Sequence, residues 1–522
     1  MAKHALIIGG GHNGMVCACY LARAGLSVTV LERHHRIGGA AITEEFHPGF
    51  RNSVASYTVS LLHPKVIDDL HLHQHGLRIL EREVNNFIPL PDGRSLTSYP
   101  DDERMHREVA KFSSVDADRL QPFYDSLDGV VGVIRDLMLE TPPALHKPGF
   151  SDLWQLFSLS MTFNRMSIEE KRQLLRLFSG SAGELLDDHF ESDPIKALIG
   201  FDAIVGNYAS PYQAGSAYVL LHHVIGEVNG KQGRWGHAVG GMGAISDAIA
   251  QEAKSLGVIL ETDVTVKQVL VQNNRAVGVL LENGESLHAD LVVSGVNPKL
   301  LYLSLLDEGD ISDSTIAHFR QYKCQSGSFR MNVALSELPT FSADTPPKAL
   351  TGGVIMAPSL RYMDQAYHDA TRHGFSREPV VEMMIPSVVD PSLAPEGQHV
   401  ASLFCQQFDP SLGDAWASRR GEAAETIIET VNKFAPGFRE SIIGTQVLSP
   451  WDLEQRFGLI GGDIFHGRLS LDQLFTARPM LGAGQYRTEI NGLFMCGSGT
   501  HPGGGVSGAP GHNAAREILS RL

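Results

Sequence analysis

The amino-acid sequence predicts an α/β protein that combines a discontinuous, Rossmann-like dinucleotide-binding domain with a mixed-sheet domain and an inserted helical subdomain. Residues 4–41 read as a strand, a glycine-rich turn, a helix and a second strand. Residues 101–225 are mostly helical in pattern, and the alternation of strands and helices returns over residues 240–296. Residues 325–450 mix strands with proline-rich loops, which indicates a second sheet. The helical stretch therefore interrupts one α/β domain.

The first stretch, ALIIGGGHNGMVCACYLARAGLSVTVLE, carries a dinucleotide-binding pattern between its strand and its helix. The GxGxxG pattern consists of Gly9, Gly11 and Gly14. The first glycine permits a tight turn, the second lets the backbone approach a pyrophosphate, and the third lets helix and strand pack closely. The helix N-terminus offers N–H groups to the phosphates. Glu32 closes the second strand, where a carboxylate accepts hydrogen bonds from both hydroxyls of an adenosine ribose and repels a 2′-phosphate.

The pair Gly38-Gly39, shortly after Glu32, indicates which dinucleotide binds. A nicotinamide site ends its pattern at the acid. A second glycine pair soon afterwards is typical of flavoproteins of the glutathione-reductase type, where it lets the chain cross beside the cofactor's phosphates. Arg36 precedes the pair, and we expect it to point a charge at those phosphates. The sequence therefore predicts bound FAD rather than NAD.

The C-terminal segment CGSGTHPGGGVSGAPGHNAA contains a second GxGxxG match, between a strand and a helix. Its glycines are Gly503, Gly505 and Gly508. A second nucleotide site and a purely structural glycine loop are alternatives. No strand with an acid follows the helix, which favours a third interpretation: the helix points its N-terminus at the N1–C2 carbonyl region of the flavin ring and stabilises negative charge on the reduced ring.

Composition and charge limit the classes of partner. The formal net charge is −16, which disfavours nucleic acid and anionic membrane surfaces as partners. The five cysteines form no CxxC pair, and the histidines are scattered, so we expect neither a redox dithiol nor a metal site. No targeting segment precedes the first strand, and no apolar run is long enough to span a bilayer. These features predict a cytoplasmic protein with at most a peripheral membrane contact.

One segment within the helical stretch is strongly apolar. GFSDLWQLFSLSMTF, residues 149–163, contains a single acid and apolar residues that are not confined to one helical stripe. It is either a buried helix of the inserted subdomain or a hydrophobic lip that admits a lipid-like substrate and rests on a membrane. The first interpretation is favoured.

Three segments together resemble the carotenoid/retinoid oxidoreductases, the phytoene desaturase-like flavoproteins. They are LIIGGGHNGMVCACYLARAGLSVTVLERHHRIGGAA, GGMGAISDAIAQEAKSLGV with ADLVVSGVNP, and GLFMCGSGTHPGGGVSG. The resemblance covers essentially the whole chain and is weakest over 101–230. The domains that we expect are an FAD-binding domain in three parts (1–100, 231–300 and 451–522), a helical and substrate insertion (101–230) and a substrate domain (301–450).

The resemblance also implies which residues hold FAD. Val266 would hold the adenine through its backbone, with Val264 as the alternative register. Gly497 and the following loop, which includes Gly505 and Gly508, would lie beside the flavin. The remaining contacts implied are Gly9, Gly11, Gly14, Glu32 and Gly39.

The predicted function is that of an FAD-dependent oxidoreductase that acts on a hydrophobic, isoprenoid or lipid-like substrate, with flavin N5 as the hydride acceptor. Asp463 and His466, from the segment GGDIFHG, are the candidate catalytic residues that would orient the substrate or relay a proton. An enzyme similar to flavin amine oxidases and a non-catalytic FAD-binding regulatory protein are the alternatives.

Overall fold

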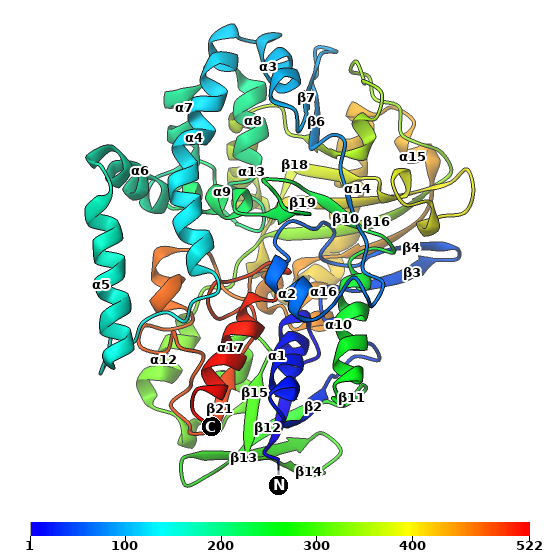
Figure 1. Ribbon diagram of the computed structural model, residues 1–522. Coiled ribbons are helices and arrows are strands. Elements are labelled where there is room, and N and C mark those ends of the chain that lie inside the picture. Colours follow the sequence, from blue (N-terminus) through cyan, green and yellow to red (C-terminus); the bar gives the residue numbers. More distant parts are fainter. Residues whose placement is uncertain (1) are drawn as a thin grey trace.

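The computed structural model describes residues 2–522, and its first sheet is entirely parallel (Figure 1). The strand order is β11 (Ile259–Glu261), β2 (Ser27–Leu31), β1 (His4–Ile8), β15 (Leu291–Ser294) and β21 (Leu493–Met495). The central strands are runs of apolar residues with both faces buried, as expected for a parallel sheet covered on both sides. Strands from both ends and the middle of the chain meet here, and the predicted α/β class is confirmed.

Helices cover one face of this sheet and a small antiparallel sheet covers the other. The helices are α1 (His12–Arg23), α10 (Gly243–Ser255) and α17 (Ala509–Leu519), with α1 between the other two. The small sheet consists of β12 (Val266–Gln272), β13 (Arg275–Leu281) and β14 (Ser286–His288). α17 lies so close to α1 that a Cβ at Gly511 would overlap the Asn13 carbonyl oxygen. Glycine at this position therefore lets the two helices pack.

A seven-stranded mixed sheet forms the second domain. Its order is β20 (Ile442–Leu448), β16 (Ser328–Leu335), β19 (His399–Phe408), β18 (Phe375–Met384), β17 (Gly353–Met356), β6 (Asn86–Pro89) and β7 (Ser95–Ser98). Only β17 and β6 run parallel; the other neighbours are antiparallel. Residues 86–98 thus extend this sheet, although they belong to the stretch expected in the FAD-binding domain.

The two faces of this sheet bury different kinds of side chain. Along β16, Phe329, Met331 and Val333 pack against the helix α14 (Trp416–Phe434). Because side chains alternate along a strand, Arg330 and Asn332 lie on the opposite face. The register places Arg330 beside Phe404 on β19, and Phe404 beside Glu382 on β18. A buried row of arginine, phenylalanine and glutamate therefore crosses the face that looks away from α14.

The stretch expected to be helical forms successive helices above the first sheet (Figure 1). They are α3 (Asp102–Ala110), α4 (Ser114–Leu137), α5 (Phe150–Arg165), α6 (Ile168–Ser179), α7 (Ala182–His189), α8 (Asp193–Phe201) and α9 (Ser216–Val224). Ser167 caps α6 through a reciprocal pair of hydrogen bonds with Glu170, of 3.1 and 2.6 Å. The chain breaks between α6 and α7 at Gly180, where a Cβ would come within 2.5 Å of the Arg176 carbonyl oxygen.

Shorter elements connect these layers. The helices are α2 (Pro64–Asp69), α11 (Pro298–Leu300), α12 (Asp313–Gln321), α13 (Leu360–His373), α15 (Phe438–Ser441) and α16 (Pro450–Phe457). The short strands pair as β3 (Thr43–His47) with β4 (Phe50–Ser53), β5 (Ile79–Glu81) with β10 (Gly236–Ala238), and β8 (Glu227–Val228) with β9 (Lys231–Gln232). Among the helices of residues 2–522, none is both long and apolar enough to cross a membrane.

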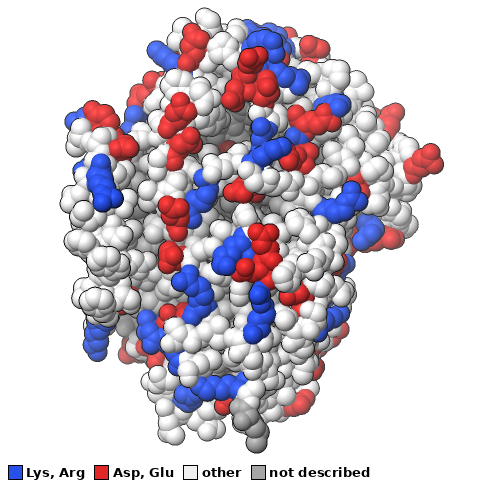
Figure 2. All heavy atoms as spheres, in the orientation of Figure 1, with Lys and Arg blue, Asp and Glu red and all other residues white. Residues whose placement is uncertain are grey.

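The expected burial of the segment 149–163 is wrong. None of the side chains of α5 is buried, and Phe150, Trp154 and Phe157 are 88%, 64% and 55% exposed. These three recur at helical spacing, so they form one exposed stripe with Leu153 and Met161. The left edge of Figure 2, where α5 lies in Figure 1, accordingly carries few charges. The helix contacts the protein along one side only, so its apolar composition is not matched by burial.

Candidate active site

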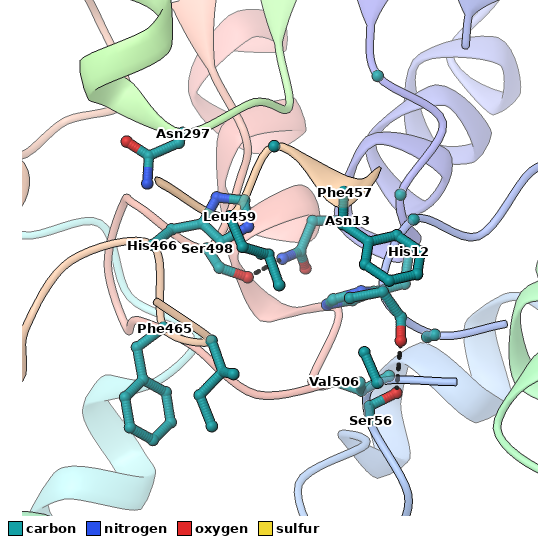
Figure 3. A pocket seen from close by; sticks show the side chains of 18 of the residues that line it. His12, Asn13, Ser56, Asn297, Phe457, Leu459, Phe465, His466, Ser498 and Val506 are labelled. Carbon is teal, nitrogen blue, oxygen red and sulfur yellow. Dashed lines mark hydrogen bonds between the residues drawn. The ribbon is translucent and has the colours of Figure 1, made fainter. Parts of the chain in front are cut away.

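A cavity of about 500 Å³ begins at the carboxyl ends of β1 and β2 and extends to the seven-stranded sheet. Figure 3 shows part of its lining, including His12, Asn13 and His466. In open α/β sheets, ligands bind in the crevice outside the carboxyl ends of the strands. The cavity has a dinucleotide-sized groove along the glycine turn. It ends in a compartment, here called the chamber, between the first sheet and the second domain. The chamber is lined by Tyr57, Arg82, Phe201, Asp202, Val205, His222, His223, Trp235, Glu382, Phe404, Ile464 and Phe465.

The glycine turn has the geometry that the sequence pattern predicts. Gly9 has a φ of +95°, and a Cβ at Gly14 would overlap the Gly9 carbonyl oxygen. The position of a Cβ on Gly11 meets no atom within 4 Å, because Gly11 faces the open cavity. The Gly38 N–H donates to the Gly10 carbonyl at 2.9 Å, and a Cβ on Gly39 would lie 3.2 Å from the Gly11 Cα. The second glycine pair therefore crosses directly beside the first.

Glu32 makes structural hydrogen bonds that its sequence pattern does not indicate. Its carboxylate accepts the Gly10 N–H at 2.7 Å and the His34 N–H at 2.8 Å, one on each oxygen. Glu32 is 7% exposed and lines the cavity. Since an ionised carboxylate offers about four lone-pair sites, two remain for ribose hydroxyls.

The polar groups of the groove fit a dinucleotide. The N-terminus of α1 has no side-chain cap, so its first-turn N–H groups are available to phosphate oxygens. His12 Nε2, Asn13 Oδ1 and His466 Nδ1 are buried without a hydrogen-bond partner in residues 2–522. At the adenine end, the Val264 N–H already donates to the Glu32 carbonyl at 2.9 Å. This contact favours Val266 as the residue whose backbone holds the adenine.

The structure separates the predicted FAD residues into two groups. Those that line the cavity are Gly9, Gly11, Gly14, Glu32, Gly39, Val266 and Gly505. Gly38, Gly497 and Gly508 lie behind it and permit close packing; a Cβ on Gly497 would come within 2.5 Å of the Gly295 carbonyl oxygen. Arg36 does not point into the cavity, because its guanidinium donates to the Thr43 carbonyl and pairs with Asp247 at 2.8 Å. Its expected contact with the phosphates is therefore not seen.

Asp463 is not in the cavity, and its predicted catalytic role is corrected. The carboxylate is fully buried and accepts the N–H groups of Gln325 and Phe465, both at 2.8 Å, and the Ser326 hydroxyl at 3.3 Å. Burial raises the pKa of the Asp463 carboxyl. The Asp463 oxygens thus join its own loop to the segment before β16, and they are not free to contact a substrate.

His466 does line the cavity, on the loop that Asp463 shapes. Its backbone has a φ of +57°, and burial lowers the pKa of its imidazole to about 3, so the ring is neutral at physiological pH. Figure 3 shows Asn13, His466 and Ser498 coming together from three segments, and the Asn13 amide donates to the Ser498 hydroxyl at 3.0 Å.

Arg478, which the sequence did not indicate, holds this arrangement together. It is fully buried, and its guanidinium donates to the carbonyl oxygens of Phe465, Gly467 and Ser498 at 2.6–3.3 Å. The Tyr322 hydroxyl donates to the His466 carbonyl at 3.1 Å. Arg478 therefore joins the histidine loop to the C-terminal loop.

The floor of the chamber is the polar row on the second sheet. The Tyr57 hydroxyl donates to Glu382, and the Tyr57 ring stacks on Phe404 at 5.0 Å. The Arg330 guanidinium carbon lies 4.7 Å from the centre of the Tyr57 ring. The Arg82 guanidinium carbon lies 6.0 Å from the centre of the Trp235 ring, and its Nη2 donates to the Thr58 hydroxyl.

Burial shifts most of the ionisable groups of the chamber toward their neutral forms. Burial, with the neighbouring Glu382 charge, raises the pKa of Asp202 to about 8, and burial raises the pKa of Glu382. Burial lowers the pKa of His222 to about 3 and that of His223 to about 4. The arginines are the groups that keep a full charge at neutral pH.

A family model described as flavin containing amine oxidoreductase matches residues 14–328. The chain belongs to this family. The protein is an FAD-dependent oxidoreductase, and the predicted cofactor and enzyme class are confirmed. The polar groups of the groove are consistent with that cofactor.

Other proteins resemble this flavin oxidoreductase over its full length. Pyridine nucleotide-disulfide oxidoreductase domain-containing protein 2 of Rattus norvegicus is 38% identical, over 99% of this chain and 93% of that protein. A neurosporene-forming phytoene desaturase of Cereibacter sphaeroides is 26% identical, over 100% of this chain and 94% of that protein. The expected resemblance to phytoene desaturases is thus confirmed as a distant one. Putrescine oxidase bound to putrescine superimposes with a TM-score of 0.58 at 16% identity, over 100% of both chains, so the two share a fold.

Proposed function

We propose that this oxidoreductase removes hydrogen from a mainly hydrophobic, isoprenoid or lipid-like substrate in the chamber. The supporting observation is the continuity of the cavity, which leads from the glycine turn to aromatic and aliphatic walls at Phe201, Val205 and Phe404. FAD, when bound, supplies a hydride acceptor at its N5 atom. In this proposal the dinucleotide domain is of the glutathione-reductase type, because Gly38-Gly39 crosses beside Gly11.

His466 is the proposed proton acceptor. Loss of a hydride and a proton from neighbouring carbons leaves a double bond in the substrate, and the proton needs a base. The His466 Nδ1 lies at the cavity wall without a hydrogen-bond partner in residues 2–522, and its lone pair can accept the proton. Arg478 is a positioning residue, since it acts through the loop that carries His466. The neighbouring Ile464 and Phe465 keep water away from the reacting carbons.

The charges of the chamber favour this substrate class over a simple amine. An ammonium group would need an ionised carboxylate, but Glu382 is engaged by the Tyr57 hydroxyl and Asp202, with a pKa of about 8, is mostly protonated at neutral pH. Arg82 and Arg330 would repel the ammonium.

The test is flavin reduction in an oxygen-free cuvette. FAD-loaded protein is mixed with squalene, farnesol, oleate or octylamine, and bleaching of the visible flavin band is followed. We expect bleaching by at least one isoprenoid or lipid and none by octylamine. Bleaching by the amine alone, or by none of the four, would contradict the proposal.

His466→Ala tests the role of the histidine in the same assay. Loss of a general base lowers the rate by about 10²–10⁴-fold. His106→Ala is the control, because His106 is an exposed histidine on α3, outside the cavity lining. An unchanged rate of flavin reduction in His466→Ala would remove the proposed proton transfer.

A further inference from the structure

We infer that Arg82 forms a binding site for a carboxylate group of the substrate, so that the enzyme's substrate is an acid with an apolar chain. The inference rests on the proposed function, in that it assigns the chamber to the substrate. Its evidence is the set of hydrogen bonds and ion pairs that the buried arginines of this chain make.

Arg82 is an unusually unsatisfied guanidinium. It is 6% exposed and lines the chamber, and its side chain makes a single hydrogen bond, from Nη2 to the Thr58 hydroxyl. Its Nε is buried without any partner in residues 2–522. A guanidinium carries five N–H donors, and buried donors in native proteins are nearly always paired. A ligand in the chamber would supply the missing acceptors.

The other fully buried arginines make more hydrogen bonds than Arg82 does, although the Nε of Arg330 also lacks a partner in residues 2–522. Arg478 donates to several backbone carbonyls, and Arg330 donates to the Leu403 carbonyl at 3.0 Å and the Ser402 hydroxyl at 2.6 Å. Within residues 2–522, neither Arg82 nor Arg330 has a carboxylate within ion-pair distance. Arg82 is therefore the buried cation that lines the chamber, while Arg330 lies behind Tyr57, and Glu382, whose charge acts on both arginines, accepts the Tyr57 hydroxyl.

A carboxylate fits these groups better than other anions. Its two oxygens match the planar donors of one guanidinium. Asp202, kept largely protonated by burial, can donate a further hydrogen bond to it. A phosphate with two negative charges would need more hydrogen-bond donors than Arg82 offers among these mainly apolar walls. The walls at Phe201, Val205 and Trp235 accommodate an apolar chain rather than a second polar group.

Isothermal titration calorimetry of the FAD-loaded protein tests the inference without any turnover. The probes are octanoate, 1-octanol and octylamine, which share a chain length and differ in the head group. We expect octanoate to bind about 10–100-fold more tightly than octanol, the range of a charge-assisted hydrogen bond. Arg82→Gln should remove this preference and leave octanol binding unchanged, and Arg82→Lys should keep part of it.

Arg94→Gln is the matched control, since Arg94 is 60% exposed and pairs with Asp92 on the surface. Thermal melting and FAD content check that each Arg82 variant is folded and loaded. Three results would overturn the inference. They are tighter binding of octylamine than of octanoate, an equal loss of affinity for octanoate and for octanol in Arg82→Gln, and loss of FAD from folded Arg82→Gln. If octanoate binding depends on Arg82 but no substrate reduces the flavin, the carboxylate site is supported and the proposed oxidation is not. The two proposals can therefore be refuted independently.

Discussion

Glu32 should stabilise both the empty protein and the bound cofactor, and two substitutions separate these effects. In the free protein its carboxylate accepts two backbone N–H groups, from Gly10 at 2.7 Å and from His34 at 2.8 Å. Glu32→Ala removes both acceptors. Glu32→Gln keeps one carbonyl oxygen as an acceptor and replaces the other with an amide that cannot accept, so one of the two hydrogen bonds is lost.

The magnitude follows from the charge and burial of the group. A hydrogen bond to a charged group contributes about 1.5–3 kcal/mol. Glu32→Ala should therefore lower the free energy of unfolding of the apoprotein by about 3–6 kcal/mol and Glu32→Gln by about half as much. Loss of the ribose hydrogen bonds should weaken FAD binding by a further 1.5–3 kcal/mol or so, roughly 10–150-fold in Kd.

Urea unfolding of the apoprotein and calorimetric titration with FAD measure the two quantities. Glu261→Gln is the control, because Glu261 is exposed on the neighbouring strand β11. Should Glu32→Ala bind FAD as tightly as the wild type while its apoprotein is destabilised, the ribose contact is wrong and only the structural role stands. Unchanged values of both quantities would refute the reasoning entirely.

Two further predictions concern pH and the exposed helix. Five buried histidines with pKa values of about 3–4 are protonated only after unfolding, so the free energy of unfolding should fall as the pH drops from about 6.5 to about 4.5. They are His12, His222, His223, His466 and His501. The carboxyls of Asp202, Glu382 and Asp463 have raised pKa values and oppose this trend, but they are fewer than the histidines. The free energy of unfolding should therefore change by up to about 3 kcal/mol per pH unit. A pH-independent urea midpoint in this range would contradict it. The exposed apolar stripe of α5, a helix with one acid in its first turn and one base in its last, should make the protein float with phosphatidylcholine vesicles. Trp154→Asp should abolish flotation, and Leu481→Asp, at another exposed apolar residue, should not. If the wild type does not float, the expected membrane contact is wrong.

The dinucleotide groove was predictable because its chemistry is local in the sequence. The turn depends on glycines within a few residues of each other: Gly9 has a positive φ, Gly14 packs against the Gly9 carbonyl, and Gly11 faces the open cavity. Glu32 lies at the end of the next strand, where the parallel pairing of β1 and β2 brings it beside the turn. Short-range constraints of this kind can be read from one sequence.

Two other predictions failed because they depend on three-dimensional neighbours. Asp463 is close to His466 in sequence, but its carboxylate accepts the Phe465 N–H two residues on, as aspartates in turns often do. The segment 149–163 has a core-like composition, yet burial depends on how many elements surround a helix, which composition does not report. The buried Arg478 was missed for the same reason, since its carbonyl partners come from separate loops.

The chamber could not be predicted either, because its lining residues come from separate segments of the chain. Strand register brings Arg330, Phe404 and Glu382 into one row, and Arg82, directly after β5, donates to Thr58 beside Tyr57. A pure hydrocarbon would remove water from the Arg82 guanidinium and leave its donors unpaired, which costs about 1–3 kcal/mol or more. An ammonium group would lie beside the buried Arg82 guanidinium, which has no ion-pair partner in residues 2–522. An acid with an apolar chain avoids both costs, because its carboxylate pairs with Arg82 while its chain contacts the aromatic walls, and this is the combination that the chamber should prefer.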